Sequence, residues 1–120
     1  MTILLEAADR ALRLEPDTAG GAVLVWTEGD ERLVLGKDDR ADLCGSLVSS
    51  LERALSDEFT VVGSIQGVPV LHLLALERTM IYLSMDRRHL YVQDDENRPI
   101  GQLEVDENKL HAWTNALRHG

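Results

Sequence analysis

The apolar residues near the start of the chain recur at helical spacing. They are Leu4, Leu5, Ala8, Ala11 and Leu12. Thr2 precedes this stripe as a helix cap, and Pro16 follows it with a pair of glycines at residues 20–21. Proline and glycine do not continue a helix. The pattern therefore predicts a first helix that ends before Pro16.

The next apolar run predicts a hairpin, and a second helical stripe follows it. Residues 22–26 are continuously apolar, residues 28–31 form a polar turn with one glycine, and residues 32–35 form the returning strand. Asp38 and Asp39 then place negative charge where a helix begins. The stripe behind them is the clearest amphipathic helix in the chain and consists of Cys44, Leu47, Val48, Leu51 and Leu55.

From Phe59 onward the period changes to two, which is typical of strands. Strands are expected over residues 59–66, 68–76, 81–85, 89–93 and 100–105, with an exposed loop over residues 94–99. Pro69 fits the start of its strand or a sheet edge better than the middle of a sheet. A last helix, capped by Asp106, has an apolar face made of Leu110, Trp113 and Leu117.

These elements define the expected fold. We predict an α+β protein in which residues 1–120 form a single compact domain with no linker or internal repeat. Its mainly antiparallel sheet has about five to seven strands in the order α-β-β-α-β-β-β-β-β-α, with the helices packed on it. Aromatic residues are scarce, so the core is expected to be aliphatic, with Trp26 and Trp113 packed into it.

The charge of the chain excludes several classes of function. Asp and Glu total 21 against 12 Lys and Arg, which gives a net charge of −9. Direct nucleic-acid binding is not expected, because its affinity comes mostly from Lys and Arg.

The longest apolar stretch, residues 68–76, is far shorter than the ~20 residues that cross a bilayer, and no basic leader starts the chain. A single cysteine favours a reducing compartment, so we expect a cytoplasmic protein with no membrane association.

No group of side chains indicates a reaction type. Cys44 lies in register with the apolar stripe of the middle helix, which predicts a buried, unreactive thiol. None of the four histidines has the spacing of a metal site. His72, in the middle of an apolar strand, is either a core histidine or one that points to the polar face of the sheet. We therefore expect no enzyme activity, no catalytic or metal-binding residues and no cofactor.

The order of elements resembles that of a known family. It is similar to the order in roadblock-type domains, which have a helix, two strands, a helix, three strands and a final helix. Those domains pair as dimers and scaffold small GTPases. The rhythm of residues 59–86 is similar to their central meander, and the hairpin at residues 89–105 departs from it. Acidic bacterial secretion chaperones are similar in size and charge but usually place three strands before the middle helix. Small immunity proteins and phage-encoded inhibitors share the size and the acidity.

The sequence favours a non-enzymatic protein that binds a partner protein through an anionic surface, as an inhibitor, an immunity-type protein or a chaperone. A partner with a basic surface is expected, because charge complementarity speeds encounter and selects the partner. The predicted partner-binding residues are Asp94, Asp95 and Glu96, with Asp38, Asp39 and Asp42 as a second patch. The alternative is a roadblock-like homodimeric scaffold for a small GTPase, paired through the middle helix or an edge strand.

Overall fold

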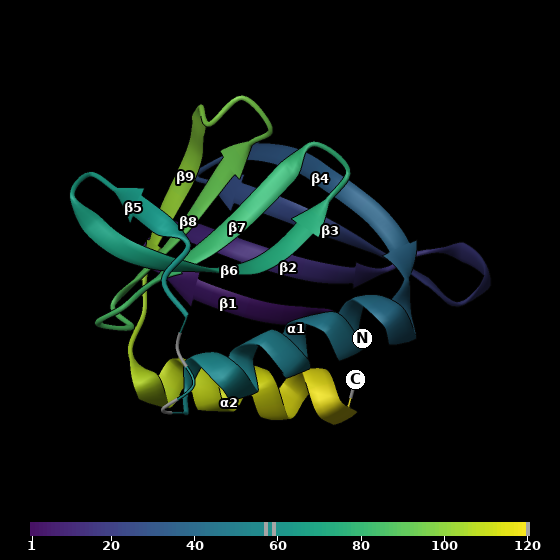
Figure 1. Ribbon diagram of the computed structural model, residues 1–120. Helices are drawn as coiled ribbons and strands as arrows, with labels where there is room; N and C mark the ends of the chain where they lie inside the picture. The colour runs from purple at the N-terminus through teal and green to yellow at the C-terminus, as the bar shows by residue number, and fades with distance from the viewer. Residues whose placement is uncertain (57, 59, 120) are drawn as a thin grey trace.

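The structure, a computed structural model, describes residues 1–56, 58 and 60–119. Two helices and two meandering sheets make up most of this part of the chain (Figure 1). The elements are β1 (Ile3–Ala7), β2 (Arg10–Pro16), the short 3-10 helix η1 (Thr18–Gly20), β3 (Gly21–Glu28), β4 (Glu31–Asp39), α1 (Arg40–Ala54), β5 (Gly63–Ile65), β6 (Val68–Leu76), β7 (Thr79–Ser84), β8 (His89–Asp94), β9 (Pro99–Glu104) and α2 (Glu107–His119).

The strands form two antiparallel sheets, so the prediction of one sheet was wrong. The first sheet has the order β1-β2-β3-β4 and the second has the order β5-β6-β7-β8-β9. Each sheet is an up-and-down meander, and a helix follows its last strand in the chain. Alternating apolar residues cannot by themselves assign a strand to one sheet or to the other, because the strands of both sheets show the same period of two.

The predicted first helix does not exist, since β1 and β2 form a hairpin there. Its turn contains Ala8 with a φ of 55°, a left-handed conformation that no α-helix contains. Ile3 and Leu5 are buried, and Leu4 between them is 39% exposed, which is the alternation of a strand. Leu4, Leu5 and Leu12 satisfy helical spacing as well, and the chain follows the pattern that pairs Leu5 with Leu12 across the hairpin.

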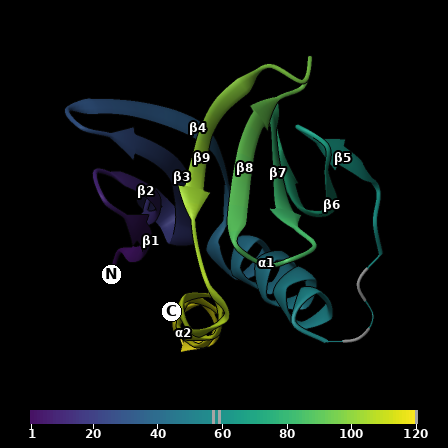
Figure 2. The ribbon, with the colours of Figure 1, turned by 90° about the vertical axis from the view of Figure 1, so that its left-hand side faces the viewer.

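The two sheets face each other, and the helices lie across one end of the space between them (Figure 2). One core cluster joins both sheets and both helices, and it includes Trp26 and Trp113 as expected. Trp26 of β3 lies against Gly101 of β9, where an added Cβ would come within 2.2 Å of the indole Cζ2. The absence of a side chain at residue 101 therefore allows the two sheets to approach each other.

Other predictions are confirmed. The hairpin of β3 and β4, the middle helix, β6 over residues 68–76 and the last helix all occur where the pattern placed them. Asp39 caps α1 by accepting a hydrogen bond from the Asp42 N–H at 3.2 Å. Asp106 likewise accepts one from the Lys109 N–H at 2.7 Å, at the start of α2. In both cases a short acidic side chain satisfies an N–H group that the helix itself leaves unpaired.

The observed order also removes the basis of the roadblock resemblance. That likeness rested on a helix before the first strands, where the structure has a hairpin instead. The strand expected to begin at Phe59 starts at Gly63 and spans only three residues, and Phe59 itself lies outside the described residues. Within the described part of the chain, no helix is both long and apolar enough to cross a membrane.

Candidate functional site

The outer face of the second sheet, which points away from the first sheet, is hollowed. The main hollow has a volume of about 810 Å³. One wall is formed by β5 and its turn, the floor by β6 and β7, and the far rim by the end of β8 and the loop that follows it. We call this hollow the outer groove; its lining includes Val62, Ser64, Ile65, His72, Tyr82, Gln93 and Asn97.

The groove exists because the sheet curls. β5 pairs only with residues 68–70 of β6, through a two-residue turn in which Gln66 and Gly67 both have positive φ angles of 54° and 79°. Such turns carry the strong right-handed twist of two-stranded ribbons. β5 is separated from β8 by two strands, yet residues 62–66 and Gln93 line the same hollow. The β5–β6 hairpin therefore bends over the outer face (Figure 1).

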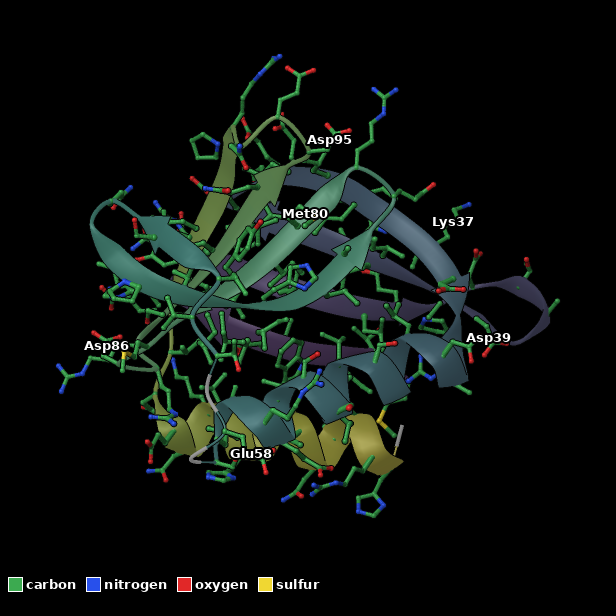
Figure 3. All side chains as sticks on the ribbon, viewed as in Figure 1. Lys37, Asp39, Glu58, Met80, Asp86 and Asp95 are labelled. Carbon is green, nitrogen blue, oxygen red and sulfur yellow. The ribbon has the colours of Figure 1, made fainter. Side chains whose placement is uncertain are left out.

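The lining of the groove is neutral. No Asp, Glu, Lys or Arg lines it among the described residues, although the protein as a whole carries a charge of −9. The rings of His72 and Tyr82 meet edge to face, with centroids 5.6 Å apart. Met80 lies on the same face of β7 (Figure 3). Amide, hydroxyl and aromatic groups beside apolar side chains suit an uncharged ligand or a polypeptide backbone.

His72 lies on the outer face, which was one of the two positions expected for it. Its Nε2 atom is shielded from solvent and has no hydrogen-bond partner within residues 1–56, 58 and 60–119. A general base needs an orienting group such as a carboxylate within hydrogen-bond reach. The part of the chain that the structure describes contains no hydrogen bond or ion pair between His72 and a carboxylate. His72 therefore contributes to the floor of the groove, with a polar atom that has no partner among the described residues.

The acidic loop predicted to bind a partner lies at the rim of the groove. Asp94 is occupied in holding the turn, because its Oδ1 accepts hydrogen bonds from the N–H groups of Glu96 and Arg98, both at 2.9 Å. Glu96 is paired with Arg98. Asp95 is exposed and has no ion-pair partner among the described residues. Since Gln93 and Asn97 line the groove on either side of this loop, Asp95 is the carboxylate left available there.

The second predicted patch lies elsewhere. Asp38 accepts a hydrogen bond from the Asp39 N–H at 2.7 Å, and Asp39 caps α1. Asp42 lies in the first turn of that helix. Asp39 and Asp95 are on well-separated parts of the molecule in Figure 3. The structure thus keeps the two acidic patches apart, and Asp38 and Asp39 have local roles at the start of a helix.

Cys44 is buried, as expected. It lies on α1 beside a second hollow of about 560 Å³, which is also lined by Arg40 and Arg118. Burial raises the pKa of the Cys44 thiol, and the nearby Arg40 opposes this effect only in part. A nucleophilic cysteine needs a lowered pKa and an accessible sulfur. Neither condition holds at Cys44, so its thiol has the properties of a core residue.

Most Lys and Arg side chains are engaged within the molecule. Arg32 donates hydrogen bonds of 2.6 and 2.8 Å to Glu15, and Arg13 donates one of 3.0 Å. The hydrogen bond from Arg32 is the largest of the effects that lower the pKa of Glu15 to about 2, and the contact with Arg13 adds to it. Burial acts in the opposite direction. Further intramolecular contacts to carboxylates or carbonyl oxygens are made by Arg10, Lys37, Arg40, Arg87, Arg98, Lys109 and Arg118. Most Lys and Arg side chains thus form contacts within the molecule, and the excess Asp and Glu side chains remain without a cationic partner among the described residues.

Among the described residues, side chains of the same chain bond to one or two backbone groups on three of the four sheet edges. On β4, the Leu35 carbonyl accepts from the Thr79 hydroxyl at 3.2 Å, and the Lys37 N–H donates to Glu77 at 3.2 Å. On β9, the Gln102 carbonyl accepts from Arg10 at 3.0 Å. On β1, the Glu6 carbonyl accepts from Lys109 at 3.1 Å. Such contacts blunt the tendency of a strand edge to pair with another chain.

β5 is the exception. Within the described residues, no side chain bonds to its outer edge. Val61 and Val62, which lead into it, are 47% and 58% exposed. This edge was not predicted from the sequence, although two adjacent valines before a glycine were a visible signal for it.

Comparison with protein-family models, with curated proteins and with solved structures gives no match. Within the part of the chain that the structure describes, no three or more His, Cys, Asp or Glu side chains gather in a way that could hold a metal ion. In the described part of the chain, the surface features that bear on function are the neutral groove, the acidic loop at its rim and the outer edge of β5.

Proposed function

We propose that the protein is a non-enzymatic binder of a partner protein with a basic surface, and that it acts as an inhibitor, an immunity-type protein or a chaperone. The observation that carries this proposal is the unequal use of charge. Most arginine and lysine side chains are bonded to groups of the same molecule, whereas acids such as Asp38, Asp42 and Asp95 have no ion-pair partner among the described residues. Unpaired surface carboxylates attract a cationic partner and orient its approach.

The neutral groove beside the acidic loop supports the same proposal. Charged residues at the rim of an interface govern the association rate, and the uncharged centre supplies the contact area. The proposal is supported by the position of Asp95, which is exposed in the loop beside a hollow of about 810 Å³. Asp94 keeps its charge but is less free than Asp95 to contact a partner directly, because its carboxylate already accepts two backbone hydrogen bonds.

The test is capture of the partner, followed by kinetics with matched charge variants. The tagged protein is incubated with an extract of the organism that encodes it, bound proteins are identified by mass spectrometry, and the purified partner is used to measure association rates. One variant carries Asp95→Asn with Glu96→Gln. The control carries Asp30→Asn with Glu31→Gln, two exposed acids at the β3–β4 turn that lie outside both predicted patches and outside the lining of the groove, so both variants lose two negative charges and have the same net charge.

We expect a basic partner in stoichiometric amount, and slower association for the Asp95 and Glu96 variant than for the control, with a weaker dependence on salt. Equal rates for the two variants would mean that overall charge and not this rim guides the encounter. Recovery of no stoichiometric partner under native conditions, together with turnover of a small molecule by the purified protein, would contradict the proposal.

A further inference from the structure

The proposed function leaves four features of the described residues without a role. They are the hollow beside Cys44, the Nε2 atom of His72, the exposed Leu33 and Val34 on β4, and the outer edge of β5. The outer edge of β5 supports the most specific proposal. Its register leaves backbone groups unpaired, its residues are exposed, and it adjoins the outer groove with Asp95 at the rim. We propose that β5 takes an extended segment of the partner as an additional strand, so that the second sheet gains a sixth strand on binding. This inference rests on the proposed function and names its binding site.

The register shows which backbone groups are available. In a two-residue hairpin, the residues on either side of the turn form a hydrogen-bonded pair, and bonded and non-bonded pairs then alternate. Ile65 pairs with Val68 next to the turn, so Ser64 and Pro69 form the non-bonded pair. The Pro69 carbonyl accepts instead from the Met85 N–H at 2.8 Å, on the β7 side. The N–H and C=O of Ser64 accordingly point away from β6, toward the uncovered edge.

The surroundings of Ser64 favour an extended backbone as the occupant. Ser64 is exposed, as are Thr60, Val61, Val62 and Gly63 before it. A free N–H and C=O pair on an extended strand is satisfied by another strand, which is how edge-strand recognition supplies affinity. On the other sheet edges, side chains of Thr79, Arg10 and Lys109 each occupy one outward carbonyl, whereas no such contact is present at Ser64 among the described residues.

The groove and its rim define the side chains of that segment. Val62 and Ser64 both line the outer groove, together with the other residues of 62–66. The Val62 N–H donates to the Val70 carbonyl at 2.9 Å, which keeps the start of this segment against β6. A strand added beside β5 continues the curl of the sheet, so its side chains on the same face enter the groove above His72 and Tyr82. The groove is neutral and partly apolar, and Asp95 stands at its rim. The segment therefore has alternating apolar side chains, with a Lys or Arg positioned to reach Asp95.

One substitution tests the backbone contact without disturbing the fold. Ser64→Pro removes the outward N–H and leaves the Val68 and Val70 pairings of β5 in place, because proline is tolerated on an edge strand when its nitrogen faces solvent. Ser64→Thr keeps the N–H and is the matched control. Val62→Lys is a second variant, which places a charge on the edge and in the groove while keeping every backbone donor. Circular dichroism and the thermal midpoint establish that each variant is folded.

The probe is a phage-displayed library of random dodecapeptides, selected on the wild-type protein. Selected peptides are synthesised, their dissociation constants are measured by fluorescence anisotropy, and their sites are mapped by shifts of backbone amide resonances. We expect peptides with alternating apolar residues and at least one Lys or Arg, and shifts centred on Val61–Ile65, His72 and Tyr82. Ser64→Pro should weaken binding by about tenfold, the worth of roughly one to two backbone hydrogen bonds, and Ser64→Thr by less than about twofold.

The proposal is overturned if selected peptides shift other parts of the protein or bind Ser64→Pro as tightly as the wild type. It is also overturned if no peptide is selected and the protein forms a dimer that Ser64→Pro abolishes, since the edge then serves a second copy. These failures are distinguishable from failure of the proposed function: a captured native partner whose binding depends on Asp95 but not on Ser64 would keep the function and reject this site.

Discussion

The contact between Trp26 and Gly101 makes a sharp prediction about how the two sheets are held together. A Cβ at residue 101 would lie 2.2, 2.3 and 2.8 Å from Cζ2, Cε2 and Nε1 of Trp26. Carbon atoms in contact are normally about 3.5–4.0 Å apart. The indole is 4% exposed and belongs to the central core cluster, so it cannot move aside into solvent without losing its packing.

Gly101→Ala should therefore destabilise the protein by about 3 kcal/mol or more, at or above the upper end of the usual 1–3 kcal/mol for overpacking. The measurement is urea denaturation followed by Trp fluorescence and circular dichroism. Gly45→Ala is the control, because no atom lies within 4 Å of an added Cβ there and Gly45 is inside α1. That substitution should stabilise the protein by about 0.5–1 kcal/mol through helix propensity.

A rescue variant separates the predicted clash from a general effect on β9. Trp26→Phe removes the indole atoms nearest residue 101, so the double variant should be more stable than the sum of the single effects predicts, by about 1 kcal/mol or more. A cost below about 0.5 kcal/mol for Gly101→Ala, or additive effects in the double variant, would refute the packing of the two sheets described here.

Three further outcomes follow from the buried and paired groups. The pKa of Glu15 is about 2 in the folded protein against an ordinary 4.5, so its pairing stabilises fully above pH ~4.5 and is lost as pH falls toward ~2; Glu15→Gln should flatten the decline in stability across that range in acid titrations, and an unchanged slope would contradict the pairing. Cys44 should react slowly with a thiol reagent in the folded state and rapidly in urea, because burial raises its pKa and shields the sulfur; rapid reaction of the folded protein would contradict this. His72→Phe should maintain or raise stability by up to about 1 kcal/mol, since it removes a shielded polar atom without a partner among the described residues; a marked loss in thermal denaturation would mean that Nε2 is satisfied.

The sequence predicted those elements whose signals are local. The middle helix carries a stripe of one period and an acidic cap, and β6 is a single apolar run that begins next to Pro69; both occur where they were expected. At residues 3–16 the apolar positions fit both the spacing of a helix and the alternation of a strand. The observed strand pattern is stabilised by the pairing of Leu5 with Leu12 and by packing against the core, which a local spacing rule does not register.

The candidate site was only partly visible in the sequence, for a different reason. The acidic loop was recognised from composition, and the structure places Asp95 at a rim while assigning Asp94 to its own turn. The β5 edge differs from the other edges because they accept side-chain contacts from distant parts of the chain, such as that of Leu35 with Thr79, 44 residues apart. Pairings across that separation have no periodic signature.

The most direct measurement is hydrogen exchange at the Ser64 amide. In the free protein this N–H should exchange rapidly, because it points away from β6 toward solvent. When a selected peptide or the native partner is bound, it should become at least about tenfold slower, since a strand added to β5 supplies its acceptor. Unchanged rapid exchange in a saturated complex would show that the partner does not pair with this edge.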